Sequence, residues 1–347
     1  MYLNDVWYCV ALGTEITRKP LRRIICSEPV VMYRTENGSI VALEDRCSHR
    51  QVPLSTGRLV GDQIQCMYHG FTFNTDGVCT HVPHQNAPKS AAIRAYPVEE
   101  RWGYIWLWRG DKAAADSGKI PTLPWTQSPE FRSVYFYWHV KSNFQIGADN
   151  LLDESHTDFL HRSSIGTETG MEGDEGHATV KCHIDGDQVH CVRKVENAKL
   201  SPVAAKWAGS ELPLTRSNTQ KWEAPNTVHM LMRFHETGRA VHMEHIFTPE
   251  TESTCHYFMN WTRNFTLGND AYPTDQDIID AHRIVPDEDM FMMEAQQENL
   301  KWFKNPADVA AKADVFVVNA HRVLAGMHKR AGNPIPSEVG RDINVSL

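Results

Sequence analysis

The chain has 347 residues and a formal net charge of −8. Its length favours two domains, and its acidity argues against nucleic acid or an anionic membrane surface as the main partner. The sequence contains no apolar run of about eighteen residues, so no transmembrane helix is expected. The first residues lack the regions of a signal peptide, and the eight cysteines are too scattered for a secreted disulfide scaffold. We therefore expect a cytoplasmic protein.

Residues 1 to about 110 have the pattern of a small β domain. The apolar runs Val30–Tyr33 and Ile40–Leu43 flank the dipeptide Asn37-Gly38, which is typical of a hairpin turn. In the later run Tyr104–Trp108, two tryptophans alternate with two aliphatic residues. This alternation predicts a strand with one pair of side chains facing the core.

Two short segments of this region each offer one thiolate and one imidazole. Cys47 precedes His49 by two positions, and Cys66 precedes His69 by three. A zinc finger usually groups its cysteines in one knuckle and its histidines in another. Here both cysteines could bind one iron of a binuclear cluster and both histidines the other, which raises the reduction potential to roughly −150 to +300 mV. Zinc or a disulfide-stapled loop remains an alternative.

The two segments, Cys47–Arg50 and Cys66–Gly70, resemble the motif of Rieske [2Fe-2S] proteins. The resemblance implies a [2Fe-2S] cluster held by Cys47, His49, Cys66 and His69. A plant-type cluster would need four cysteines.

An Ala-, Gly- and Pro-rich stretch over residues 111–129 marks the expected domain boundary. We divide the chain into domains 1–115 and 116–347. In the second domain, Phe131–Val140 is predicted to be a strand, and residues 175–265 return to strand-like alternation. A turn-rich section over 210–226 is expected to form loops over a cavity. The fold class is α+β: an all-β domain followed by a domain with an antiparallel sheet and helices.

Helices are predicted over residues 143–161, with an interruption, from Asp275 to about Leu300, and over about 306–330. His156 and His161 lie in the first of these. Because each helical residue turns about 100°, a spacing of five places them roughly 140° apart. They can share one metal ion only if the helix ends or bulges between them. The pair alone is weak evidence for a metal site.

The segment from Asn150 through Asp153 and His156 to His161 resembles the iron-binding segment of Rieske non-haem iron oxygenases. The resemblance implies a helix-grip-type catalytic domain in which His156, His161 and Asp289 bind mononuclear Fe²⁺ as a 2-His-1-carboxylate triad. It also places Asn150 close to the iron.

The run Pro286–Asp289 has a proline followed by acids, as at the first turn of a helix. We therefore expect Asp287 and Glu288 only to complement the helix dipole. The resemblance implies another role for Asp153, as a bridge between a cluster histidine of one subunit and an iron histidine of its neighbour. That role implies a homotrimer, or stacked trimers, with head-to-tail contacts.

Three looser segments, Trp7-Tyr8, His245–Thr251 and Glu294–Gln297, resemble the branch of vanillate O-demethylases, dicamba monooxygenases and toluenesulfonate methyl-monooxygenases. The branch implies the terminal oxygenase of a monooxygenase that receives NAD(P)H electrons through a flavin- and [2Fe-2S]-containing reductase. With O₂ it would hydroxylate a methyl or methoxy group of an aromatic acid. His245 matches a substrate-carboxylate contact of this branch, and Arg233 would suit a carboxylate or sulfonate through its fork of donors.

Two other functions remain open at this point. A ring-hydroxylating dioxygenase would form cis-diols from the same cofactors. A Rieske electron carrier would need only about the first hundred residues, so the second domain with its candidate triad argues against it.

Overall fold

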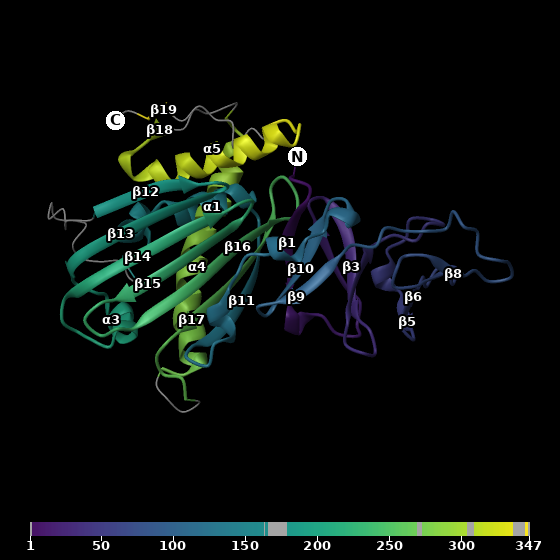
Figure 1. Cartoon of the computed structure of the whole chain (residues 1–347), viewed down its shortest axis with the longest axis horizontal. Coiled ribbons are helices and arrows are strands. Elements are labelled where there is room, and N and C mark those ends of the chain that lie inside the picture. Colours follow the sequence, from purple (N-terminus) through teal and green to yellow (C-terminus); the bar gives the residue numbers. More distant parts are fainter. Residues whose placement is uncertain are drawn as a thin grey trace. The chain divides into compact units, whose positions relative to one another are not determined.

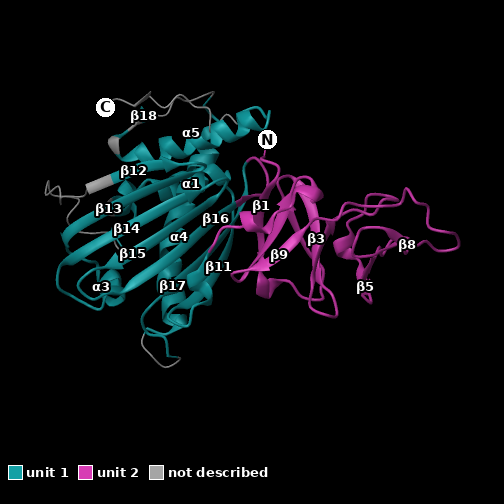
Figure 2. Cartoon of the chain, viewed as in Figure 1, with its two compact units in different colours: residues 1, 123–247, 253–347 teal, residues 2–122, 248–252 magenta. Residues whose placement is uncertain are grey.

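The computed structural model describes residues 2–162, 164–165, 179–268, 273–303, 309–335 and 344–345. The chain forms two compact units (Figure 2). Unit 2 comprises residues 2–122 and 248–252, and unit 1 comprises residue 1 with 123–247 and 253–347. None of the described helices is long and apolar enough to cross a membrane.

Unit 2 consists of three small sheets, as expected for an all-β domain. The first has the order β1-β10-β9, the second β2-β3-β4 and the third β5-β6-β7-β8. The strands are β1 (Val6–Leu12), β2 (Leu21–Ile25), β3 (Glu28–Arg34), β4 (Ile40–Glu44), β5 (Arg58–Val60), β6 (Gln63–Gln65), β7 (Thr72–Phe73), β8 (Cys79–His81), β9 (Val98–Arg101) and β10 (Tyr104–Arg109). Short 3₁₀ turns over 13–15, 54–56, 112–114 and 117–119 connect or follow them.

The predicted hairpin is present as β3 and β4, with Gly38 in the turn at a φ of 89°, where glycine is favoured. The prediction for Tyr104–Trp108 was wrong in one respect. All five side chains of this run are buried, not one alternate set. Strand β10 is the central strand of its sheet, between β1 and β9, and both of its faces are covered.

Unit 1 is built on a seven-stranded sheet with the order β11-β17-β16-β15-β14-β13-β12. Strands β12 to β16 each run antiparallel to the next, and β11 runs antiparallel to β17. The strands are β11 (Arg132–Val140), β12 (Thr179–Asp185), β13 (Gln188–Ala198), β14 (Leu214–Glu223), β15 (Thr227–Phe234), β16 (Ala240–Pro249) and β17 (Cys255–Arg263). A two-stranded pair, β18 (Val309–Ala310) with β19 (Asn344–Val345), lies outside this sheet. The predicted α+β class is confirmed.

The helices of unit 1 pack on this sheet (Figure 1). Side chains of α1 (Phe144–Leu152), α3 (Pro202–Ala208) and α4 (Asp275–Leu300) join those of the strands in one core. Helix α5 (Val315–Arg330) packs along β13 and β12. The 3₁₀ turns η5 (Pro124–Gln127), η6 (Glu154–His156) and η8 (Lys312–Asp314) and the short helix α2 (Thr157–Leu160) complete the unit.

Two expectations about this unit were wrong. Residues 214–223 form strand β14 and not loops, because the alternation of buried and half-exposed side chains continues through them. Pro286 lies in the interior of α4 and not at a first turn, since the helix begins at Asp275 behind a capping box formed by Thr274 and Asp277. The acids that follow Pro286 therefore do not serve the helix N-terminus.

Candidate active site

The two Cys/His segments of unit 2 form a pair of matching tight turns. The amide of Gln51 donates to the carbonyl of Cys47, and the amide of Gly70 donates to the carbonyl of Cys66. Both cysteine side chains are buried, whereas His49 and His69 are exposed. The two imidazole ring centres lie 4.7 Å apart. The ring of His49 also stacks on Phe71 at 4.8 Å.

These side chains suit a binuclear cluster. Burial and the adjacent thiol of Cys66 raise the pKa of Cys47 to about 11. Two neighbouring thiolates in this buried position therefore need a cation to stabilise them, which the inner iron of a [2Fe-2S] cluster supplies. The adjacent imidazoles can bind the outer iron, close to solvent.

In unit 1, His156, His161 and Asp289 come together as one cluster. One potential ligand atom from each residue lies within 4.8 Å of the other two. The Nε2 atoms of His156 and His161 lie 3.4 and 3.0 Å from the same oxygen, Oδ1 of Asp289. Two imidazoles and one carboxylate are the donor set of mononuclear non-haem iron, so these residues fit such an ion.

The break in the helix makes this convergence possible. Helix α1 ends at Leu152, and Asp153 serves both as its C-cap and as the N-cap of the following 3₁₀ turn. The Asp153 carboxylate accepts a hydrogen bond of 2.9 Å from the amide of Ser155. Because the backbone changes from α to 3₁₀ and back, the rings of His156 and His161 have centres 5.1 Å apart. The predicted interruption is confirmed.

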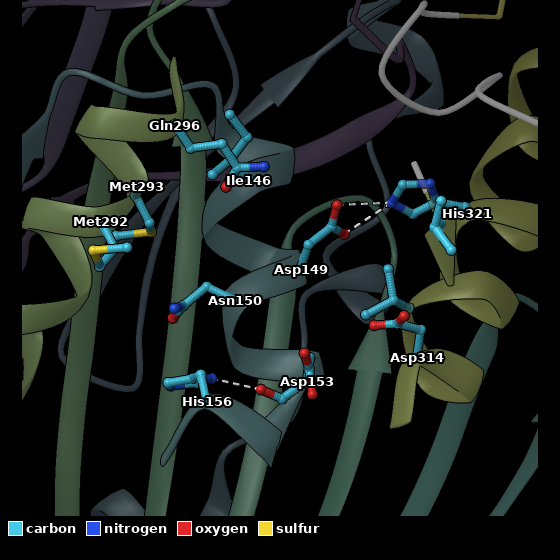
Figure 3. Close-up of a pocket in the computed structure, with 12 residues that line it drawn as sticks. Ile146, Asp149, Asn150, Asp153, His156, Met292, Met293, Gln296, Asp314 and His321 are labelled. Carbon is cyan, nitrogen blue, oxygen red and sulfur yellow. Dashed lines mark hydrogen bonds and ion pairs between the residues drawn. The ribbon is translucent and has the colours of Figure 1, made fainter. Parts of the chain in front are cut away.

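The second ring nitrogen of each histidine, Nδ1, also makes a hydrogen bond. The Nδ1 of His156 donates to the carbonyl of Asp153 at 2.5 Å, as Figure 3 shows. The Nδ1 of His161 donates to the carboxylate of Glu288 at 2.7 Å. Such partners orient the rings of metal-binding histidines and raise their basicity. Glu288 therefore orients His161, and the expectation that it only complements a helix dipole was wrong.

Asn150 lies on the last turn of α1 and donates from its amide nitrogen to Oδ1 of Asp289 at 3.2 Å. Burial opposes ionisation of Asp289, but hydrogen bonds from His156 and His161 lower its pKa to about 2. Burial likewise opposes protonation of His161, yet the hydrogen bond and charge of Asp289 raise its pKa. Asp289 is therefore a carboxylate at neutral pH and can act as a ligand.

A mainly apolar cavity opens beside the three residues, on the helix-covered face of the sheet. Side chains of β14 to β17, α3, α4 and the α1–α2 segment line it, among them Trp207, Met230, Met232, Met243 and Val285. Of the predicted substrate contacts, His245 lies in this lining and Arg233 does not. Strand alternation exposes Arg233 on the other face of β15 from Met232. The prediction for Arg233 was therefore wrong.

The cation in the described lining of the cavity is Arg216, a buried residue of β14. It lies two positions before Asn218, which also lines the cavity. Sequence reasoning missed Arg216 because it assigned that section to loops. Correct recognition of the alternation over 214–223 would have placed it on an inward face.

His245 is fully buried, and burial lowers its pKa to about 3, so its ring is neutral at neutral pH. Its Nδ1 lies 2.7 Å from the hydroxyl of Tyr257. The alternative acceptor for that hydroxyl is the sulfur of Met259 at 3.8 Å, a weak acceptor. We therefore assign the Tyr257 proton to Nδ1 of His245. The other nitrogen, Nε2, then bears hydrogen, and it is buried without a hydrogen-bond partner among the described residues.

A second pocket of about 290 Å³ also has His156 in its lining (Figure 3). Asp149, Asn150 and Asp153 line it from the α1 side, and His321 lines it from α5. The carboxylate of Asp149 receives a hydrogen bond of 2.8 Å from Nε2 of His321. Asp153 thus lies beside His156, at the wall of a pocket separate from the apolar cavity.

Comparison with known proteins supports this arrangement over almost the entire chain. Residues 6–97 match the Rieske [2Fe-2S] domain, and residues 140–330 match the vanillate O-demethylase oxygenase C-terminal domain. The chain is 37% identical to the oxygenase component of dicamba O-demethylase from Stenotrophomonas maltophilia over 77% of this chain and 80% of that protein. It is 34% identical to the toluene-4-sulfonate monooxygenase iron-sulfur subunit TsaM1 from Comamonas testosteroni over 90% and 93%.

The structural comparison agrees with these relatives. A crystal structure of dicamba monooxygenase bound to 3,6-dichlorosalicylic acid superposes with a TM-score of 0.88, at 29% identity, and covers 96% of this chain and 99% of that one. A crystal structure of the same enzyme with non-haem iron and dicamba has a TM-score of 0.79. The chain belongs to the Rieske non-haem iron oxygenases: it is a monooxygenase component that uses a [2Fe-2S] cluster and a mononuclear iron.

Proposed function

We propose that this oxygenase hydroxylates the methyl or methoxy carbon of a small aromatic acid. The observation that carries the proposal is the position of His245, which has a buried Nε2 and lines the same cavity as Asp289, His156 and His161. On a methoxy substrate the reaction is ArOCH₃ + O₂ + NAD(P)H + H⁺ → ArOH + HCHO + NAD(P)⁺ + H₂O. An aryl methyl group would instead give the alcohol.

Cys47, His49, Cys66 and His69 would hold the cluster, and His156, His161 and Asp289 would hold Fe²⁺. When bound, these groups supply single electrons and dioxygen activation. We propose a boundary between the two domains at residues 115/116.

The remaining residues of the cavity bind and orient the substrate. The Nε2–H of His245 donates to a carboxylate or sulfonate oxygen, and the Tyr257 hydroxyl keeps that proton on Nε2. Arg216 adds positive charge to the lining. Apolar side chains such as Met230 and Met243 contact the ring and exclude water. Holding the reacting carbon in one position lowers the entropic cost of the reaction.

The electron supply involves other protein chains. A reductase with flavin and a [2Fe-2S] centre would deliver electrons from NAD(P)H, which places the enzyme in the cytoplasm. We assign Asp153 to the route between a neighbour's cluster and His156, because it lines the pocket beside that histidine (Figure 3). Such a route requires a head-to-tail assembly, and a homotrimer or stacked trimers satisfies it.

A substrate screen tests the proposal directly. Methoxybenzoates, methylated aryl sulfonates and the matching uncharged methyl esters are offered to the iron-replete enzyme with a reductase, NADH and O₂. With the anionic substrates we expect NADH consumption to be coupled to product formation, either a phenol with formaldehyde or a benzylic alcohol. With the esters we expect no such coupled product. Formation of cis-diols would support a ring-hydroxylating dioxygenase instead.

Iron content separates the oxygenase from a simple electron carrier. A Rieske carrier holds two irons per chain, whereas the proposed site assignment requires three. The variant His156→Ala should keep the visible spectrum of the cluster and lose substrate turnover. Turnover at the wild-type rate would remove His156 from the site.

A further inference from the structure

Two cysteines that the oxygenase reaction does not use lie directly opposite each other in unit 1. Cys182 of β12 and Cys191 of β13 are register partners in an antiparallel pair. Opposed residues in such a pair have Cα atoms about 4.5–5.5 Å apart, and disulfides join Cα atoms about 4.4–6.8 Å apart. The Cα separation expected for these two residues therefore lies within the range that a disulfide spans.

The two thiols differ in exposure and in acidity. Cys182 is half-buried and Cys191 is buried. A hydrogen bond from the Cys191 thiol stabilises the Cys182 thiolate and lowers the pKa of Cys182. The same hydrogen bond, together with burial, raises the pKa of Cys191. The first proton therefore leaves Cys182, the less buried residue of the pair, while Cys191 remains a thiol.

The pair also lies close to the functional segment. Cys191 lines a cavity of about 170 Å³ together with Asp153, Ser155 and Arg193. Arg193, two residues along β13, forms an ion pair of 3.3 Å with Glu154. A change of bonding at Cys191 therefore occurs beside the turn that leads into His156. No other described cysteine of this sheet has a cysteine as its register partner: Cys255, for example, faces Val140.

We propose that Cys182 and Cys191 form a redox-active dithiol that hydrogen peroxide closes into a cross-strand disulfide. The Cys182 thiolate attacks one peroxide oxygen, the O–O bond breaks, and the departing hydroxide takes up a proton to leave as water. Cys182 is then a sulfenic acid. The sulfur of Cys191 attacks the sulfur of Cys182, and the hydroxyl leaves as water with the Cys191 proton. In sum, two thiols and one peroxide give one disulfide and two waters. The proposal does not depend on the substrate of the oxygenase.

The test uses the holoenzyme without reductase or NADH, so that the added peroxide is the oxidant. The protein is treated with equimolar hydrogen peroxide, alkylated, digested without reductant and analysed by mass spectrometry. We expect a linked pair of peptides containing Cys182 and Cys191, lighter by two hydrogens and separated by dithiothreitol. Free, alkylated Cys182 and Cys191 after peroxide treatment would overturn the proposal, as would a link between other cysteines.

Three variants assign the roles of the two sulfurs. Cys191→Ser should stop at the sulfenic acid of Cys182, which dimedone traps. Cys182→Ser should leave Cys191 reduced under the same conditions. Cys255→Ala is the matched control in the same sheet and should form the Cys182–Cys191 link as the wild type does. Rapid oxidation of Cys191 in the Cys182→Ser variant would reverse the assignment and contradict the proposed order.

Discussion

At the scale of single residues, His161 is held by two consecutive acids of α4. Its Nδ1 donates to Glu288 and its Nε2 lies against Asp289. The two carboxylates therefore fix the ring from opposite sides. If iron takes the place of the proton on Nε2, Glu288 remains as the partner that determines the orientation of the ring and its basicity.

We expect Glu288→Gln to weaken binding of Fe²⁺ at the mononuclear site by about 10- to 100-fold, since a neutral amide stabilises the ligating ring less than a carboxylate. Titration of iron-depleted protein, followed by iron analysis, measures the change. Asp287→Asn is the control, because Asp287 is the preceding acid and its side chain is exposed. Equal affinities in the two variants would contradict the role of Glu288.

The residues of this site differ in how far the sequence could reveal them. The triad His156, His161 and Asp289 followed from a resemblance of motifs, not from spacing alone. Glu288 could not be separated from Asp287 in sequence, because the two acids differ only in which side of α4 they occupy. Arg216 could be recognised as a cavity residue only once β14, the strand that turns its side chain inward, was known. Contacts across the sheet, such as that between His245 and Tyr257, depend on strand register, which the sequence pattern did not specify.

At the scale of elements, α1 approaches the sheet closely at Gly147. A Cβ on this residue would lie 2.5 Å from the Cδ1 and Cε1 atoms of Phe247 in β16. Alanine in a helix interior is normally more stable than glycine by about 0.5–1 kcal/mol. Here the overlap costs about 1–3 kcal/mol, as overpacking in a core generally does. The steric cost therefore exceeds the gain in helix propensity.

We expect Gly147→Ala to lower the free energy of unfolding of the catalytic domain by up to about 2.5 kcal/mol, the largest difference between these two effects. Gly326→Ala in α5 should instead raise it, because the added Cβ would meet only the far end of Arg330, at 3.5 Å. Denaturant unfolding monitored by tryptophan fluorescence compares the two variants. Stabilisation by both substitutions would show that α1 can move away from β16.

The elements of the fold were predicted well where alternation or turn residues were strong and less well elsewhere. The β3–β4 hairpin and strand β11 agree with the expected runs, and β13 and β16 lie in the region expected to alternate. Pro286 was misleading because proline usually marks a first helical turn, whereas here the capping box at Thr274 begins the helix well before it. Because both faces of β10 are buried, its alternation of aromatic and aliphatic residues does not separate a core side from an exposed side.

At the scale of the whole molecule, three neutral histidines of unit 1 make its stability depend on pH. Burial lowers the pKa of His245 to about 3 and those of His242 and His282 to about 4. The unfolded chain therefore binds more protons than the native protein between about pH 4 and 6.5. Stability accordingly falls as pH is lowered through this range, by up to about 1.4 kcal/mol per pH unit for each histidine.

We expect His242→Gln to flatten this dependence, because it removes one of the three groups. His242 suits the test since it stacks on Trp125 at 4.3 Å and does not line the cavity of the metal site. The control is His235→Gln, which changes an exposed histidine of the same sheet region. Unfolding free energies are measured between pH 4.5 and 7. An unchanged slope in His242→Gln would contradict the contribution of this residue.

The proposed electron route through Asp153 joins neighbouring subunits. We expect Asp153→Asn to retain both metal centres, since an asparagine oxygen can still accept from the amide of Ser155. Oxidation of the reduced cluster by O₂ and substrate in a single turnover should become slower, as stopped-flow absorbance would show. Asp287→Asn serves again as the exposed control. A normal rate in Asp153→Asn would exclude the bridge.

The contact between His161 and Asp289 joins positions 128 residues apart in the chain. An ion bound there acts as a reversible cross-link between the α1–α2 segment and the middle of α4. A ligand that binds only the native state raises the free energy of unfolding by about 2.7 kcal/mol when its free concentration is a hundred times its dissociation constant. Cellular iron supply would then govern how long the catalytic domain survives proteolysis, as well as how fast it turns over.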